Sequence, residues 1–213
     1  MSEFVTFPIR LSEISLDIRS LHKITGDGFN KELKSVNGRF SDITAYGGYL
    51  LIEGSCHNFN FGPSVSEHFK EAEIIALLLV TLGAEYQYVE KEFKSDSLLR
   101  YMCDIIASEY TELCADYINS IVSKLAVSKS LSFSNRYSPG YCGWPTEEQK
   151  KLFSYLPEKP LGITLNNRML MSPIKSVSAV IAMGVNVTYK KYDCSGCSII
   201  NCNHKKYYYE NNS

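Results

Sequence analysis

The pattern of apolar and polar positions predicts one long helix in the middle of the chain. Between residues 95 and 125, apolar side chains recur at steps of three and four residues, and polar residues fill the positions between them. This spacing places the apolar side chains on one face of an α-helix. At 1.5 Å per residue, an unbroken helix of this length reaches about 45 Å. We therefore expect a scaffold helix along one side of the domain.

Shorter stretches have the patterns that are typical of strands. Phe7, Ile9 and Leu11 alternate with other residues, and residues 46–54 form an apolar run that is bracketed by glycines. Alternation in residues 176–183 predicts a strand with one buried and one half-polar face. Residues 162–165 predict a further short strand.

Three more helices are expected from the apolar pattern. Residues 67–82 are apolar nearly all round towards their end, which predicts a buried helix with Gly83 as its C-cap. Residues 145–156 predict a short amphipathic helix that begins with Pro145. Residues 12–21 are compatible with a short helix.

Composition limits the class of protein. The chain has 213 residues, of which 45% are hydrophobic and 21% charged, so one large domain, or one domain with small extensions, is expected. Lys and Arg total 22 and Asp and Glu total 23, which gives no electrostatic reason to expect nucleic acid or a membrane surface as a partner. The longest apolar run, residues 74–80, is too short to span a bilayer, and no signal peptide is evident. We expect a cytoplasmic protein.

Residues 135–145 concentrate chemistry and rigid backbone. Pro139 fixes its own φ, and Gly140 permits a positive φ or the close approach of a ligand. They surround one charge, Arg136, and the aromatic side chains of Tyr137 and Tyr141. A guanidinium beside exposed backbone and a tyrosine suits a small ligand with a carboxylate and a flat ring. The alternative is a tight turn whose arginine pairs with a neighbouring carboxylate.

Glu112 stands at the edge of the apolar face of the long helix. It follows Ile105 by seven residues, and two helical turns bring it back within about 20° of that position. An acid at such a place either reaches solvent or points into a site.

The last part of the chain contains a cysteine cluster. Seven cysteines are present in all, and the odd number together with the missing secretion signal argues against a disulfide framework. Cys194 and Cys197 form a Cys-x-x-Cys pair, to which Cys202 adds a third thiol. Zinc and an iron–sulfur cluster both accept such ligands, with His204, Cys142 or an exogenous group in the fourth position. A redox dithiol and a set of reduced thiols without metal are the alternatives.

The run from Arg136 to Tyr141 resembles the Arg-x-x-x-Gly-Tyr signature of the activation domain of cobalamin-dependent methionine synthase. Further blocks follow in the order that this family shows: Trp144-Pro145, Gln149, Leu152-Phe153, residues 161–165, Met169, Met171, Pro173 and residues 175–178. The resemblance covers about the second half of the chain and the helix before it. It implies an α+β fold: a curved single domain with a twisted antiparallel sheet flanked by long helices. We expect this domain in residues 1–190 and a cysteine-containing tail in residues 191–213.

The resemblance also implies a ligand, S-adenosylmethionine, and a set of residues that contact it. Arg136 would hold the methionine carboxylate, the backbone at Ser138 and Gly140 would approach the ligand closely, and Tyr141 would pack against it. Glu112, in the context Glu112-Leu113-Cys114-Ala115-Asp116-Tyr117, would accept a hydrogen bond from the ribose or the amino group. Tyr189 would supply the late tyrosine of the family. None of these residues is expected to act as a general acid or base.

The implied activity is that of a methyltransferase component. The domain would present the methyl group of S-adenosylmethionine to cobalamin while a reductant such as flavodoxin supplies an electron, so that inactive cob(II)alamin returns to methylcob(III)alamin. We expect the cobalamin to be carried by a separate methionine synthase module or another corrinoid protein. Two alternatives remain: a metal or iron–sulfur electron-transfer partner of a corrinoid protein, centred on the tail cysteines, and a binding module that kept the fold without the activity.

Overall fold

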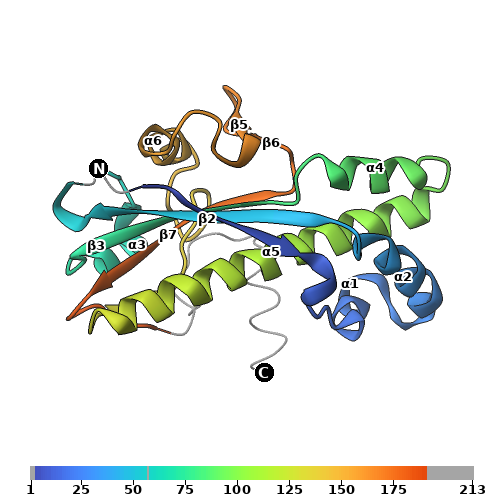
Figure 1. Ribbon diagram of the computed structural model, residues 1–213, viewed down its shortest axis with the longest axis horizontal. Coiled ribbons are helices and arrows are strands. Elements are labelled where there is room, and N and C mark those ends of the chain that lie inside the picture. Colours follow the sequence, from blue (N-terminus) through green and yellow to red (C-terminus); the bar gives the residue numbers. More distant parts are fainter. Residues whose placement is uncertain (1–2, 57, 191–213) are drawn as a thin grey trace.

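A five-stranded antiparallel sheet, in the order β1-β2-β3-β7-β4, forms the centre of the molecule (Figure 1). The computed structural model describes residues 3–56 and 58–190. The strands of the sheet are β1 (Val5–Arg10), β2 (Thr44–Glu53), β3 (Ile74–Thr81), β7 (Ser176–Gly184) and β4 (Ser132–Phe133), and a separate hairpin pairs β5 (Thr164–Leu165) with β6 (Met171–Ser172). The helices are α1 (His22–Thr25), α2 (Asn30–Asn37), α3 (Gly62–Phe69), α4 (Glu85–Glu92), α5 (Ser97–Ser128) and α6 (Glu148–Tyr155). The curled sheet and the helix beside it confirm the predicted α+β single domain.

The long helix α5 lies along one face of the sheet, as the periodicity predicts (Figure 1). Its N-terminus is capped by Asp96, whose carboxylate accepts hydrogen bonds from the amides of Leu98 and Leu99 at 3.0 Å. The helix continues unbroken for 32 residues to Ser128. The other helices in the described part of the chain have four to eight residues, so one helix carries most of this face. None of the helices described is both long enough and apolar enough to cross a membrane.

The prediction of one helix over residues 67–82 is wrong. The structure has α3 (Gly62–Phe69) and then the central strand β3 (Ile74–Thr81), which pairs with β2 on one side and β7 on the other. Both faces of β3 are covered: Leu78 and Val80 belong to one hydrophobic core, and Leu77 and Leu79 belong to the other. A strand that is buried on both faces has an almost continuous apolar sequence, which periodicity alone does not distinguish from a buried helix.

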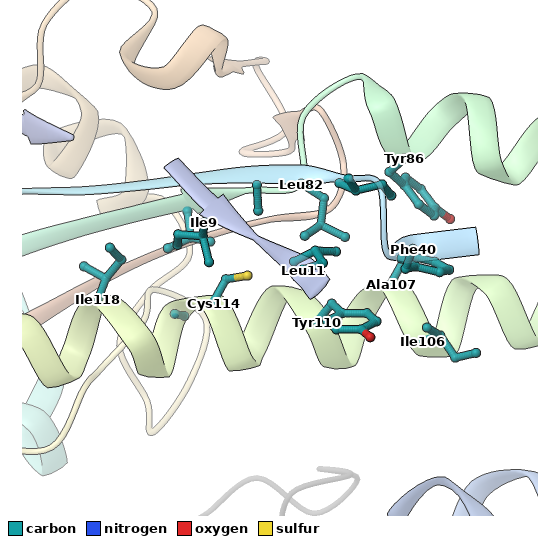
Figure 2. Packing of buried hydrophobic residues seen from close by; sticks show 14 of the residues in the cluster. Ile9, Leu11, Phe40, Leu82, Tyr86, Ile106, Ala107, Tyr110, Cys114 and Ile118 are labelled. Atoms are coloured by element: carbon teal, nitrogen blue, oxygen red, sulfur yellow. The ribbon is translucent and has the colours of Figure 1, made fainter. Parts of the chain in front are cut away.

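Two hydrophobic cores fill the two faces of the sheet. The first lies between the sheet and helices α2, α4 and α5, and Figure 2 shows Ile9 and Leu82 on the sheet side of it, facing Ala107, Cys114 and Ile118 of α5. The second lies on the opposite face, under α3 and α6, and is rich in aromatic residues, including Phe59, Phe61, Phe69 and Trp144. The chain therefore has enough apolar surface to cover the sheet on both sides.

The remaining sequence predictions are confirmed in position but differ in detail. Strands occur where residues 7–11, 46–54, 162–165 and 176–183 predict them, and α6 forms inside residues 145–156. Both faces of β7 are buried, because α6 and its neighbouring loops cover the face that was expected to be half polar. Residues 12–21 form short 3-10 turns, Leu11–Glu13 and Ile18–Leu21, in place of a helix.

Two glycine positions differ from the prediction for a physical reason. Gly48 lies inside β2 rather than at the end of a strand, and a Cβ there would stand 2.5 Å from the carbonyl oxygen of Val5. The close approach of β1 therefore requires the glycine. Gly83 has a φ of 72°, but it follows β3 and leads into α4, which the sequence pattern did not predict.

Candidate functional site

The loop of residues 135–145 closes on itself through main-chain hydrogen bonds. The amide of Gly140 donates to the carbonyl of Trp144 at 2.8 Å, and the amide of Trp144 donates back to Tyr141 at 2.9 Å. Gly140 has a φ of 92°, and a Cβ there would lie 3.2 Å from the hydroxyl of Thr146. Gly140 therefore shapes the turn, and its amide is already used within the loop.

The loop is attached to the sheet on one side and to the aromatic core on the other. Tyr137 forms an isolated bridge with Val180 of β7, with main-chain hydrogen bonds of 2.9 and 2.8 Å in the two directions. Trp144 is 1% exposed and packs edge-on against Phe61, with ring centroids 4.9 Å apart. These two attachments hold the residues between them, including Ser138 and Tyr141, in a fixed place.

Arg136 lies against α5, where it meets two acids one helical turn apart. Its Nη2 donates to Oε2 of Glu112 at 2.7 Å and lies 3.4 Å from Oδ1 of Asp116. The arginine side chain is 17% exposed, whereas those of Glu112 and Asp116 are 53% and 67% exposed. The guanidinium is thus largely withdrawn from water, while the acids keep access to solvent. The alternative raised from the sequence, that Arg136 pairs with a carboxylate, holds in this structure, and the acid concerned is Glu112.

A groove of about 390 Å³ opens beside this ion pair. It is lined by Ser108, Thr111 and Glu112 of α5, by Ser138, Pro139 and Tyr141 of the loop, by Gln149 of α6, and by Met171, Ile174, Lys175, Ser176, Val177 and Ser178. Three of the predicted ligand residues, Glu112, Ser138 and Tyr141, therefore line one groove. Arg136 reaches its edge through Glu112.

The other predicted ligand residues do not line this groove. Gly140 is not a lining residue, and its amide is hydrogen-bonded within the turn of the loop. Tyr189 is 64% exposed, and its ring lies near Phe133 of β4, with centroids 6.5 Å apart. A contact between Tyr189 and a ligand stays a prediction.

Sequence reasoning missed several lining residues that carried a usable signal. Ser108 and Thr111 precede Glu112 by four residues and by one, and Ser108 lies on the same face of α5 because helical neighbours recur at steps of three and four. Gln149 and the segment Lys175–Ser178 belong to the blocks that support the family resemblance, yet no role was predicted for them. Their place in the groove follows from the packing of α6 and β7.

Lys175 fixes one wall of the groove. Its side chain is 10% exposed, and Nζ lies 2.7 Å from Oδ1 of Asp104 and donates to the hydroxyl of Ser108 at 2.8 Å. The ammonium group also lies 5.7 Å from the centre of the Tyr86 ring. These contacts join the start of β7 to α5 across the groove and hold the two walls at a set separation.

Several polar groups around the loop are buried without a hydrogen-bond partner among residues 3–56 and 58–190. They are the side-chain amide of Asn135, Nε1 of Trp144 and Nε2 of Gln149. Asn135 is 4% exposed and Gln149 is 6% exposed. Because buried polar groups are normally satisfied, such a concentration is typical of a place where water or a ligand binds.

Burial also changes the proton affinities of groups near the loop. It raises the pKa of Tyr137 to about 12, so this phenol stays protonated at neutral pH. The imidazole of His68 stacks on Tyr137, with ring centroids 5.2 Å apart, and burial lowers its pKa, with a smaller contribution from Lys190. On α5, burial raises the pKa of Glu109, and the negative charges of Glu112 and Asp116 add to this effect.

The predicted metal ligands Cys194, Cys197 and Cys202 lie outside the described residues. Within the residues that the structure describes, no group of three or more His, Cys, Asp and Glu side chains is placed to hold a metal ion. Cys103 and Cys114 are buried between α5 and the sheet, and burial raises the pKa of each thiol to about 12. A metal site in the tail stays a prediction, which metal analysis of the purified full chain would test.

The structure is an α+β domain with a groove beside the sheet, near which a guanidinium, two acids and a tyrosine lie. Comparison with known proteins identifies its family. Residues 64–196 match the family described as the activation domain of vitamin B12-dependent methionine synthase, and the chain belongs to this family. The family resemblance of the Arg136 loop is thereby confirmed.

A solved structure shows that the fold is shared. The chain is similar to the MetH reactivation domain, crystallised bound to AdoHcy, with a TM-score of 0.62 and 16% sequence identity over 90% of this chain and 81% of that one. No curated protein matches the sequence.

Proposed function

We propose that this protein binds S-adenosylmethionine in the groove beside Arg136 and supports the reductive remethylation of cob(II)alamin on a separate methionine synthase or related corrinoid protein. The observation that carries the proposal is the ion pair between Arg136 and Glu112, because Glu112 lines the groove together with Ser138 and Tyr141. Family membership and the AdoHcy bound to the similar reactivation domain support the choice of ligand.

The charges of the site match those of S-adenosylmethionine. The guanidinium of Arg136 is a partner for the methionine carboxylate, because arginine binds carboxylates through charge-assisted hydrogen bonds. Glu112 and Asp116 supply negative charge for the ammonium and sulfonium groups of the same ligand. The ring of Tyr141, which is 49% exposed at the groove, offers an aromatic face.

The protein would act by holding the methyl donor in place. The sulfonium supplies an activated methyl group for reduced cobalamin, and an external one-electron donor such as flavodoxin supplies the reduction. The loop, α5 and β7 form rigid walls around the donor, so the ligand would be oriented by residues that already have fixed places. Ile174, at the rim of the groove, is 72% exposed, so a large partner could approach the bound donor from the solvent side.

Calorimetric titration of the full chain with S-adenosylmethionine, S-adenosylhomocysteine and 5′-methylthioadenosine tests the binding step. We expect saturable binding of the first two and weaker binding of 5′-methylthioadenosine, which lacks the carboxylate. Equal affinity for all three ligands, or no binding of any, would contradict the proposed site.

The second step is tested by visible absorption of a corrinoid protein under a controlled reducing potential. Addition of this chain and S-adenosylmethionine should convert the cob(II)alamin spectrum to that of methylcobalamin. A chain that binds the ligand but leaves the spectrum unchanged with several corrinoid proteins would support the alternative of an inactive binding module.

A further inference from the structure

The groove runs along a part of β7 that pairs with β3 on one side and, among the described residues, with no strand on the other. On the side away from β3, β4 pairs only with Met183 and Gly184, and the isolated bridge of Tyr137 adds Val180. At Ser176 and Ser178, no described strand covers this side of β7, and both residues line the groove. Within the part of the chain that the structure describes, the start of β7 is therefore an open strand edge that faces the groove.

The hydrogen-bonding groups of this edge can be assigned from the ladder. Val180 both donates to and accepts from Tyr137, so its N–H and C=O point away from β3. Along an antiparallel strand, the N–H and C=O of one residue point to one neighbouring strand, and those of the next residue point to the opposite side. The N–H and C=O of Ser178 therefore point the same way as those of Val180, towards the open edge. They present one donor and one acceptor side by side.

Gln149 adds a further donor at the same groove. It lies on α6 over the face of the sheet where Val180 and Ala182 are buried, and the side chain of Ser178 shares that face because strand residues alternate. Gln149 is 6% exposed and lines the groove, yet its Nε2 has no hydrogen-bond acceptor within the described part of the chain. A buried amide that lacks an acceptor is costly unless a ligand or water completes it.

We propose that Gln149 and the open edge of β7 at Ser178 form a subsite that recognises the hydrogen-bonding edge of a purine. With S-adenosylmethionine as the ligand, this group is adenine, so the inference rests on the proposed function and specifies how its base is read. The Watson–Crick edge of adenine carries an amine donor beside a ring acceptor, which complements the C=O and N–H of Ser178. Gln149 donates to a second ring nitrogen, and Tyr141 and Met171 supply apolar surface for the faces of the base.

The test compares Gln149→Met with wild type in titrations with S-adenosylhomocysteine and adenosine. Methionine keeps the length and bulk of the side chain but removes its hydrogen-bonding amide. We expect Gln149→Met to bind both ligands about three- to tenfold more weakly, which is the loss of one neutral hydrogen bond. Gln87→Met, at an exposed position of α4, serves as the matched control and should bind like wild type. Thermal unfolding of each variant shows whether the fold is intact.

A ligand-side measurement needs no variant. In S-inosylhomocysteine, a carbonyl replaces the adenine amine and the ring nitrogen beside it carries a proton, so donor and acceptor exchange places. Wild type should bind this analogue at least about tenfold more weakly than S-adenosylhomocysteine, because the groups of Ser178 would then face unmatched partners. Equal affinities would overturn the subsite.

The outcomes separate this inference from the proposed function. If wild type binds S-adenosylhomocysteine, while neither Gln149→Met nor the inosyl analogue changes the affinity, the subsite is wrong and the proposed function stands. If wild type binds adenosine in a Gln149-dependent way but shows no preference for S-adenosylhomocysteine, the subsite stands and the ligand assignment is wrong. If neither ligand binds wild type, both are overturned.

Discussion

Nη2 of Arg136 lies 2.7 Å from Oε2 of Glu112, although the two residues stand 24 positions apart in the sequence. One comes from a loop attached to β7 and the other from the solvent-facing side of α5. Glu112 lines the groove, and the pair therefore holds the guanidinium within hydrogen-bond distance of a side chain of the groove wall. A zwitterionic ligand would therefore meet a partner for each of its charges within a few ångströms.

Replacing Arg136 with alanine should weaken the binding of carboxylate ligands. Loss of a charge-assisted pair with a largely buried guanidinium should cost more than about 1 kcal/mol, which is at least about fivefold in the dissociation constant for S-adenosylhomocysteine. Binding of 5′-methylthioadenosine should change little, because it has no carboxylate. Isothermal titration of both ligands measures the two effects.

Arg39→Ala is the matched control for that experiment. Arg39 also pairs with a glutamate, Glu92, at 2.7 Å, but on a part of the surface that does not line the groove. The variant Arg39→Ala should therefore leave the affinity for S-adenosylhomocysteine unchanged. If Arg39→Ala and Arg136→Ala had the same effect, the role assigned to Arg136 would have to be abandoned.

Neutralising Glu112 should affect the sulfonium ligand more than its thioether product, S-adenosylhomocysteine. Glu112→Gln keeps the shape of the side chain and removes its charge, so S-adenosylmethionine loses a neighbour for both its ammonium and its sulfonium. We expect its affinity to fall by only about three- to tenfold, because exposed charges are partly screened. The affinity for S-adenosylhomocysteine should fall by less, because this ligand has no sulfonium. The ratio of the two dissociation constants, measured beside Glu92→Gln, reports the effect. An unchanged ratio would place Glu112 away from the sulfonium.

Stability should fall on mild acidification because of His68. Burial lowers the pKa of His68 below its ordinary value of 6.5, so between the two values the unfolded chain binds a proton that the folded chain does not. The free energy of unfolding therefore decreases as the pH falls through this window. His68→Phe keeps a ring against Tyr137 and removes the titration, so urea unfolding between about pH 7.5 and 5.5 should vary less in this variant.

The comparison between wild type and His68→Phe is needed because Glu109 acts in the opposite direction. Its raised pKa favours proton uptake by the folded chain, which adds stability as the pH falls towards that of a carboxyl group. A variant with the same pH dependence as wild type would show that His68 does not contribute.

Gly48→Ala should destabilise the protein at the contact between β1 and β2. The added Cβ would lie 2.5 Å from the main-chain oxygen of Val5, so a strand must shift. We expect a loss of about 1–3 kcal/mol in the free energy of unfolding, as for other overpacked positions. Gly28→Ala, where no atom lies within 4 Å of the added group, should change the stability by much less. Urea denaturation of both variants decides the point.

The sequence by itself determined the elements whose pattern is local. The periodicity of α5 and the alternation in β1 and β7 follow from how each segment buries one set of side chains. The run from Arg136 to Tyr141 and the blocks that follow it predicted the family, because their residues and their order are present in the sequence itself.

The tertiary structure decided what depends on contacts between distant segments. β3 is a strand because β2 and β7 pair with it and both faces are covered, a condition that an apolar run alone does not reveal. Glu112 pairs with Arg136, and Gln149 lines the same groove as Ser178, only because α5 and α6 pack on opposite faces of the sheet beside β7. Side chains from several elements form the groove, so their proximity is a property of the packed chain and not of any one segment.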